Sequence, residues 1–305
     1  MYSGRAKKLV GGLLDDFERR SGIDLEVRYG ESAELAATIA EEGSSSPADV
    51  FFSQDAGALG AVAGEGLLAP LPQGVLGRVD ERFRDPAGKW VGTSGRARVV
   101  AYSTKRVKAA ELPGSIFEFT DPKWKGRIGL PPSNASFQAF VSAMRIDVGD
   151  ERTRGWLEAI KRNEPKLLEN NIQTEEAIDA GEIDVGFVNH YYLYELRAER
   201  PGFAVDNHFL EAGDPGSLVN VAGAGVLKDA DNADGAAKLI DFLLSAQGQR
   251  FFSDKTFEYP LLPGADPPAG LRPLEAVQGP KVALGELGGK LRSTLELLSD
   301  TGFGA

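Results

Sequence analysis

The chain has no cysteine and very few of the other residues on which metal and redox sites are usually built. Its 305 residues include 0 Cys, 2 His and 2 Met. The absence of cysteine excludes disulfides, thiolate metal sites and cysteine nucleophiles. With only His190 and His208 available, a histidine-rich zinc or nonhaem iron site is nearly excluded as well.

Positive charge and long apolar runs are also scarce. The 34 Lys and Arg against 45 Asp and Glu give a formal net charge of −11. A chain this acidic repels nucleic acid phosphates and anionic lipid, so we expect neither as a partner. No apolar run approaches the roughly 20 residues needed to span a bilayer, and the first residues, MYSGRAKKLV, contain no signal sequence. The residues alone therefore leave two locations open: cytosolic, or exported with a signal that is not part of this sequence.

The motifs of common enzyme families are missing too. The sequence contains no G-x-S-x-G elbow, no P-loop and no H-E-x-x-H zinc motif. Pairs of carboxylates, such as Asp15–Asp16, occur on helix faces that we expect to be solvated, so a glycosidase pair is not indicated. The sequence favours a non-enzymatic protein. A hydrolase or transferase that uses a Tyr or an Asp is the alternative from another class.

What the sequence does contain is a regular alternation of strand-like and helix-like segments. A chain of 305 residues predicts one large domain or two medium ones, and the alternation is typical of an α/β fold with a mostly parallel sheet. A second unit is expected to begin near Trp90. Helices are predicted at 7–20, 32–43, 55–66, 136–149, 153–163, 233–254 and 285–298, and strands at 23–30, 47–54, 97–103, 126–131, 184–189 and 217–228. The extended segments 97–103 and 218–227 indicate a chain that passes between two lobes and returns, which places a cleft between the lobes.

The segment VNHYYLYEL, residues 188–196, concentrates the chemistry that the rest of the chain lacks. It holds three of the 7 Tyr and one of the 2 His. Consecutive tyrosines diverge both in a strand and in a helix, so they converge on one ion only where a strand ends and the backbone turns. A hard, highly charged cation such as Fe³⁺ stabilises phenolates, which makes Tyr191 and Tyr192 candidate ligands. The alternative is that the pair packs in a core. We expect Tyr194 to pack, and His190 to face away from Tyr191, on the surface or behind the ligands.

Several segments together resemble one family over nearly the whole chain. They are YSGR at 2–5, PADVFFSQDAGAL at 47–59, SGRARVVAYST at 94–104, DPKWKGRIGLPPSNASFQAF at 121–140 and AGEIDVGFVNHYY at 180–192. These segments resemble the bacterial ferric-ion-binding proteins, which are periplasmic solute receptors of iron ABC importers. The resemblance implies a two-lobed, transferrin-like type II periplasmic-binding-protein fold, in which each lobe is a mixed sheet flanked by helices and the ligand lies between the lobes. The N-terminal lobe is expected at 1–97 plus 219–275, and the C-terminal lobe at 98–218 plus 276–305.

The resemblance also implies a set of site residues. The tyrosines of the family's N-x-Y-Y element are iron ligands, and they fall here on Tyr191 and Tyr192. The positions implied to contact the anion or to lie around the ligands are Ser133, Asn134, Ala135, Ser136, Asn171, Asn189, Arg5, Arg96, Arg98, Gln54 and Asp55. A loop that opens a helix, as 133–136 does, presents backbone N–H groups to an anion, although plain N-capping by Ser133 or Asn134 is an equal alternative. The arginines need no function if they are ordinary surface or interlobe residues.

Three positions depart from the family pattern. Ala6 stands where some members have a ligand His, Gln54 where those members have a Glu, and Ser136 where others have a further Tyr. Asp55 is expected to cap the helix that follows it. The resemblance therefore implies that oxygens of an anion, or water, complete the coordination of the iron.

These observations lead to one expected function and one alternative of the same fold. We expect a monomeric receptor, periplasmic or on the cell surface, that binds Fe³⁺ with a synergistic anion (carbonate or phosphate) and delivers it to an ABC permease. Its export signal, of the soluble or the lipoprotein type, would not be part of this sequence. The alternative is a receptor for an oxyanion or a small organic acid without iron, which Ala6 and Gln54 favour and the tyrosine pair opposes.

Overall fold

The computed structural model describes residues 1–304, and the chain divides into two compact units. Unit 1 comprises Met1–Gly95, Asn220–Leu271 and Ala283–Gly289, and unit 2 comprises Arg96–Val219, Arg272–Val282 and the residues from Lys290 onward. The chain changes unit after 95 and after 219, close to the expected changes at 97 and 218. Beyond that it changes after 271, 282 and 289, where a single change at 275 was expected.

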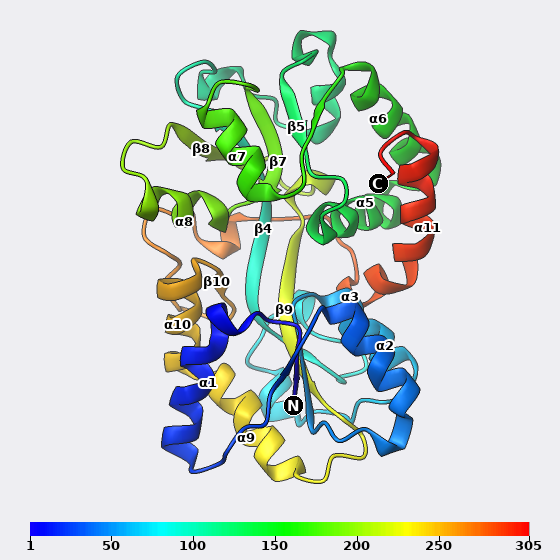
Figure 1. Cartoon of the computed structure of the whole chain (residues 1–305), viewed down its shortest axis with the longest axis vertical. Helices are drawn as coiled ribbons and strands as arrows, with labels where there is room; N and C mark the ends of the chain where they lie inside the picture. Colours follow the sequence, from blue (N-terminus) through cyan, green and yellow to red (C-terminus); the bar gives the residue numbers. More distant parts are fainter. Residues whose placement is uncertain (305) are drawn as a thin grey trace. The chain divides into compact units, whose positions relative to one another are not determined.

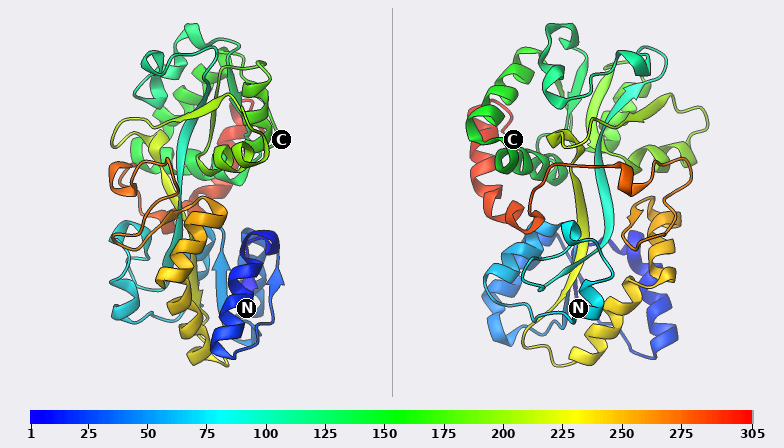
Figure 2. Two further views of the ribbon diagram at one scale, coloured as in Figure 1. Left: turned by 90° about the vertical axis from the view of Figure 1, so that its left-hand side faces the viewer. Right: turned by 180° about the vertical axis from the view of Figure 1, so that it is seen from behind.

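Unit 1 is a mixed sheet with helices on both faces. Strand β1 (Tyr2–Ser3) lies between β2 (Arg28–Tyr29) and β3 (Val50–Ser53), parallel to both. β3 pairs antiparallel with β9 (Val219–Val226), and β10 (Tyr259–Pro260) pairs antiparallel with the first half of β4 (Val91–Ser103). The helices of unit 1 are α1 (Lys7–Ser21), α2 (Ser32–Glu42), α3 (Ala56–Gly64), α4 (Gln73–Leu76), α9 (Ala233–Leu243) and α10 (Ala246–Thr256). Figures 1 and 2 show α1, α9 and α10 on one side of these strands and α2 and α3 on the other.

Unit 2 is built around the second half of β4. This half pairs antiparallel with β7 (Val185–Asn189) and with β8 (Val205–His208). β7 runs parallel to β5 (Ile128–Leu130), and β5 runs parallel to β6 (Lys166–Leu167). The helices of unit 2 are α5 (Ala135–Val148), α6 (Asp150–Arg162), α7 (Asn171–Asp179), α8 (Tyr191–Glu199) and, after its first turn, α11 (Leu287–Asp300). Short 3-10 turns elsewhere in the chain occupy Gly43–Ser45, Glu81–Phe83, Ala109–Glu111, Ile116–Thr120, Pro122–Trp124, Pro215–Ser217, Leu274–Ala276 and Leu284–Glu286.

The two faces of the unit 2 sheet carry separate hydrophobic cores. Helices α5, α6 and α11 cover one face, where aromatic residues such as Phe140, Trp156 and Phe187 form the larger cluster. Helices α7 and α8 cover the other face, where Ile178 and Leu193 belong to a smaller aliphatic cluster. Burial of both faces holds the strand ends in place, because a shift in register by one residue would move every inward side chain to the opposite face.

Most predicted elements are present, and two differ. Helix α1 begins at Lys7 as predicted and ends at Ser21. Its C-cap is Gly22, whose φ of 68° is the left-handed geometry that glycine adopts at no steric cost. The predicted single helix at 233–254 is wrong. The chain breaks at Ser245, which is extended and accepts a hydrogen bond from the Gly248 N–H as the N-cap of α10. The predicted strand at 23–30 is reduced to the two residues of β2.

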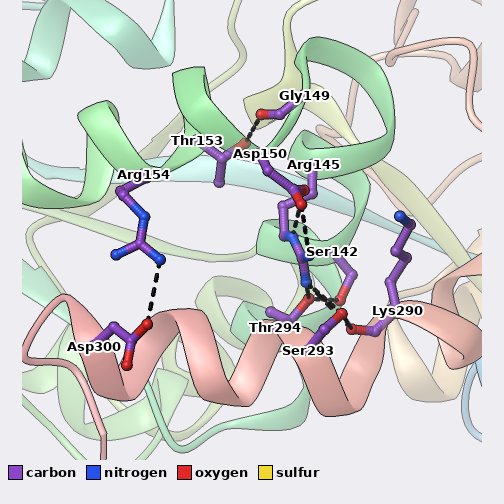
Figure 3. A network of polar contacts seen from close by, with 10 residues as sticks. All are labelled: Ser142, Arg145, Gly149, Asp150, Thr153, Arg154, Lys290, Ser293, Thr294 and Asp300. Carbon is purple, nitrogen blue, oxygen red and sulfur yellow. Dashed lines mark hydrogen bonds and ion pairs between the residues drawn. The ribbon is translucent and has the colours of Figure 1, made fainter.

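A buried arginine joins the C-terminal helix to unit 2 (Figure 3). Arg145 of α5 donates from Nε to Asp150 Oδ1 at 2.9 Å, and from one terminal nitrogen to Ser293 Oγ at 2.8 Å and Thr294 Oγ1 at 2.9 Å. The Thr294 hydroxyl also shares a 2.9 Å hydrogen bond with Ser142. Helix α11 is therefore held against the same helix whose first turn begins at the site described below.

Candidate functional site

The carboxyl ends of parallel strands β5, β6 and β7 meet at one edge of the unit 2 sheet. Each of these strands is followed by a helix: β5 by α5, β6 by α7 and β7 by α8. The first turns of all these helices therefore lie at this edge. Free backbone N–H groups and the helix dipoles make such an edge attractive to negative charge, and ligands of open α/β sheets usually bind there.

The tyrosine pair lies at the point where β7 becomes α8. The strand ends at Asn189, and His190 already has helical angles, with φ −59° and ψ −33°. Tyr191 and Tyr192 are the first residues of the helix, and their ring centroids are 4.1 Å apart with planes inclined by 33°. Tyr191 is buried and Tyr192 is half-buried. The phenols therefore lie side by side at the end of a strand and not in separate hydrophobic interiors.

Four of the other predicted residues form one hydrogen-bond network beside this strand end. The Asn134 side-chain oxygen caps α5 by accepting from the Ser136 N–H at 3.0 Å, and it also accepts from Asn171 Nδ2 at 3.1 Å. The Asn171 oxygen accepts from the Asn189 N–H at 3.2 Å. The capping alternative for Asn134 is thus confirmed, and Asn171 of α7 links this cap to the end of β7. Ser133 is exposed and stands outside this network.

Arg98 lies inside the same network as a buried cation. Only 3% of it is exposed, and its guanidinium donates to the Phe187 carbonyl at 2.7 Å, to Ser136 Oγ at 3.2 Å and to Asn189 Oδ1 at 3.4 Å. The guanidinium carbon also lies 5.4 Å from the centroid of the Phe140 ring. These contacts join the end of β7 to the first turn of α5.

The charge of Arg98 is coupled to the tyrosine pair. Burial lowers the pKa of Arg98 to about 9, and the phenols of Tyr192 and Tyr191 act in the opposite direction. Arg98 is therefore protonated at neutral pH, close to two groups that are useful as ligands only when they are negatively charged. A fixed positive charge in this position favours both phenolates and a bound anion.

The predicted residues of unit 1 are engaged with one another. Arg5 is fully buried and forms a two-pronged ion pair with Glu258, at 2.9 and 2.8 Å, and the Gln54 oxygen accepts from the same guanidinium at 2.9 Å. The charge of Arg5 is therefore balanced within unit 1. Asp55 is the N-cap of α3 and accepts from the Ala58 N–H at 3.0 Å, which confirms the capping expected of it.

The remaining predicted residues of unit 2 differ in burial and in packing. Tyr194 packs against the aliphatic cluster of unit 2, as expected. His190 is fully buried, which excludes the surface position and leaves the expected position behind the ligands. Arg96 is buried and Ala135 is exposed.

Sequence reasoning missed two further participants, Glu258 and Asn207. Glu258 neutralises Arg5, and Asn207 Nδ2 donates to the His190 carbonyl at 2.8 Å. A buried arginine such as Arg5 is expected to pair with a carboxylate, but only the folded chain shows which carboxylate lies close enough to do so.

Other kinds of metal site are not found in the part of the chain that the structure describes. Within residues 1–304 no group of three or more His, Asp or Glu side chains is arranged to hold a metal ion. The same range contains no helix of sufficient length and apolarity to cross a bilayer. The phenols of unit 2 are therefore the candidate anionic donors at this edge.

Comparison with known proteins gives consistent matches. The family model for bacterial extracellular solute-binding protein matches residues 45–276. The major ferric iron-binding protein of Neisseria meningitidis is 34% identical over 99% of this chain and 92% of its own length. The Fe(3+)-binding periplasmic protein of Serratia marcescens is 33% identical over 99% of this chain and 90% of its own length.

Solved structures agree with these matches. Iron-bound HitA from Pseudomonas aeruginosa is 32% identical and superposes with a TM-score of 0.90 over 99% of this chain and 98% of the other. The Trichodesmium protein IdiA (FutA), in complex with iron and citrate ligands, is 30% identical with a TM-score of 0.88 over the same shares. The predicted α/β, two-lobed fold class is confirmed.

Proposed function

Because the chain belongs to the bacterial extracellular solute-binding proteins, we propose that it is a periplasmic receptor for ferric ion. It is a binding protein and not an enzyme, like the relatives that it matches. The names of the relatives from Neisseria meningitidis and Serratia marcescens support iron as the cargo. The observation that carries the proposal is the pair of phenols whose ring centroids are 4.1 Å apart at the end of β7.

The chemistry of the pair suits a trivalent cation. A free phenol has a pKa near 10 and is a poor ligand while it keeps its proton. Fe³⁺ is hard and highly charged, so it displaces that proton and binds the phenolate oxygen. Tyr191 and Tyr192 begin α8, where the helix dipole also favours negative charge.

A synergistic anion completes the site in this proposal. Arg98 supplies a buried positive charge, Ser136 and Asn189 accept hydrogen bonds from it, and Asn171 donates to the Ser136 hydroxyl. The first turns of α5 and α7 open at the same edge. Carbonate, phosphate or a carboxylate such as citrate carries the oxygen donors that Fe³⁺ prefers, and one relative was solved with iron and citrate.

The hydrogen bonds already made by the predicted unit 1 residues support a proposal in which the anion supplies several of the iron ligands. The Gln54 carboxamide oxygen accepts a hydrogen bond from Arg5, and the Asp55 carboxylate caps α3. Both groups therefore already have hydrogen-bond partners within unit 1. Ala6 has no side-chain donor. We infer that oxygens of the anion and water occupy the coordination positions that Tyr191 and Tyr192 do not fill.

The receptor acts as a monomer and hands its ion to an ABC permease in the membrane. This step follows from membership of a family of solute receptors, and the name of the Serratia marcescens relative supports the periplasmic location. Arg5, Gln54 and Asp55 of unit 1, and Arg96 and Ser133 of unit 2, are not proposed as ligands of the ion.

The first prediction concerns the phenols. Addition of ferric citrate to the metal-free protein should produce a visible phenolate-to-iron charge-transfer band. Tyr191→Phe and Tyr192→Phe each remove one phenolate, so each should weaken the band and lower iron affinity on the order of 100-fold or more, and the double variant should be colourless. Visible spectroscopy and competition with a chelator measure both effects.

The matched control is Tyr194→Phe. This tyrosine is on the same helix and packs against the aliphatic cluster, so its loss should leave the band and the affinity unchanged. A wild-type protein that stays colourless and takes up no iron by elemental analysis would contradict the proposal.

One observation favours a second candidate, a receptor for an oxyanion without iron. Arg98 and the helix N-termini would hold an anion even if no metal were present. Titration calorimetry with phosphate in metal-free buffer distinguishes the two. Binding that is equally tight in the Tyr191→Phe/Tyr192→Phe variant would favour the oxyanion receptor.

A further inference from the structure

The histidine between β7 and α8 has an unusual position in the sheet. His190 is 0% exposed, and its backbone is already helical, although the strand ends only one residue before it. Its side chain does not cap α8. A strand that passes into a helix without a connecting loop needs some other contact to hold the turn.

That contact is with strand β4. In the antiparallel pairing of β4 with β7, Arg98 lies opposite Asn189, so Ala97 lies opposite His190. The His190 N–H donates to the Ala97 carbonyl at 3.0 Å, as it would in a continuing ladder. In a continuing ladder the Ala97 N–H would in turn donate to the His190 carbonyl.

The histidine ring takes the place of that carbonyl. Because His190 has turned into the helix, its carbonyl points elsewhere and accepts from Asn207 Nδ2 at 2.8 Å. The Ala97 N–H donates instead to His190 Nδ1 at 3.1 Å. Ala97 is 0% exposed, so its N–H has no access to water and loses free energy if the ring acceptor is removed.

The same ring lies beside the tyrosines. Its centroid is 5.9 Å from that of Tyr191 and 6.5 Å from that of Tyr194, and both contacts are edge-on. A shift of the His190 ring would therefore change the direction in which Tyr191 leaves the helix.

We propose that His190 is a positioning residue: by accepting from Ala97 it sets the strand-to-helix turn that brings the phenols of Tyr191 and Tyr192 together. This inference rests on the proposed function for its iron readout, but its structural content concerns the metal-free protein. It assigns to the histidine no coordination of the ion. Residues that orient ligands in this way typically change metal affinity 10- to 100-fold when they are replaced.

The alternative is that His190 merely fills space, and a pair of variants separates the two. In His190→Asn, Oδ1 occupies the position of Nδ1 and keeps an acceptor for the Ala97 N–H. In His190→Leu, the bulk is kept and the acceptor is lost. We expect His190→Leu to lower iron affinity at least about 10-fold and to shift the charge-transfer band, and His190→Asn to stay within about threefold of wild type.

Further measurements keep the test decisive. In the metal-free proteins, hydrogen exchange of the Ala97 amide should accelerate in His190→Leu and remain slow in His190→Asn. If His190→Leu does not fold, Asn207→Ala is the substitute variant. Asn207 is half-buried, and its loss removes the hydrogen bond to the His190 carbonyl at the same turn, which should lower iron affinity about 10-fold.

The proposal is overturned if His190→Leu keeps wild-type affinity, band and amide protection, if His190→Asn is as impaired as His190→Leu, or if a folded Asn207→Ala binds iron normally. A wild-type protein that binds no iron would instead contradict the proposed function. In that case the exchange of the Ala97 amide alone decides the role of His190.

Discussion

A phenol becomes a ligand only when its proton is lost, so the residues around Tyr191 and Tyr192 matter as much as the tyrosines themselves. Arg98 places a buried positive charge beside them, and its pKa of about 9 keeps that charge at neutral pH. The start of α8 adds the positive end of a helix dipole. The composition of the chain leaves no thiolate donors and few imidazole donors, since it has 0 Cys and 2 His.

Glu175 allows the effect of burial on the pKa of a single carboxyl to be tested. This carboxyl in α7 is 0% exposed, and neither of its oxygens has a hydrogen-bond partner among the described residues. Burial raises the pKa of Glu175 well above the ordinary value of 4.5, while Arg197 lowers it and Glu195 raises it. The folded protein therefore binds this proton more tightly than the unfolded chain does.

The sign of the pH effect follows from that difference. Stability from the protonated carboxyl is fully present below the unfolded pKa of 4.5, and it is lost as pH rises toward the higher folded pKa. Glu175→Gln should therefore raise the melting temperature at pH 7 and change it little at pH 4. Each unit of pKa shift corresponds to about 1.4 kcal/mol.

Thermal unfolding at the two pH values measures this, with Glu176→Gln as the matched control. Glu176 is the next residue, forms an ion pair with Arg200 and is 35% exposed, so its replacement should change stability by less than about 0.5 kcal/mol. The expected protonation would be contradicted if Glu175→Gln were no more stable, relative to the wild type, at pH 7 than at pH 4.

At the scale of elements, the attachment of α11 to α5 should depend on Arg145. This side chain is 7% exposed and donates to Asp150, Ser293 and Thr294 (Figure 3). Arg145→Ala should destabilise the protein by about 1–3 kcal/mol, because buried hydroxyls lose a charged partner and packing is lost. Urea unfolding measures the change.

A matched control lies between α6 and the same helix α11. Arg154 pairs with Asp300 at 3.2 Å, but the two side chains are 45% and 62% exposed. Arg154→Ala should therefore cost about 0–0.5 kcal/mol. If Arg145→Ala and Arg154→Ala lower the free energy of unfolding equally, burial of Arg145 contributes nothing to stability.

The element scale also shows where sequence patterns succeed. Helix α1 is predictable because Leu13, Leu14 and Phe17 recur with helical spacing and Gly22 ends the run. The break between α9 and α10 was missed because apolar residues continue through Leu243 and Leu244, and only the cap at Ser245 marks it. A serine inside an apolar pattern is equally compatible with a helix interior, so only packing decides.

At the scale of the whole molecule, ligand binding should appear as thermal stability. A ligand that binds only the folded state stabilises it by about 4.1 kcal/mol at a free concentration 1,000 times its Kd. For a chain of 305 residues, loading with ferric citrate should raise the melting temperature on the order of 5–10 °C.

Differential scanning calorimetry with and without ferric citrate measures the shift, and sodium citrate alone serves as the control. The Tyr191→Phe/Tyr192→Phe variant should lose it. A wild-type shift produced equally by citrate without iron would favour the oxyanion receptor over the ferric receptor.

The fold class and the tyrosine pair were accessible from the sequence because both depend on local chemistry. Alternating apolar periodicities predict an α/β chain, and adjacent phenols at the end of an apolar run, in a chain with 0 Cys, favour a hard cation. These inferences need only the order of neighbouring residues.

The tertiary structure decided how the remaining residues are used. Arg5 pairs with Glu258, which is 253 positions away, and His190 takes the place of a carbonyl opposite Ala97, which is 93 positions away. Hydrogen bonds and ion pairs of this kind depend on distances of about 3 Å between distant parts of the chain, and strand register sets those distances. The amino acids determined which donors the protein possesses, and the folded sheet determined which of them remain for a ligand.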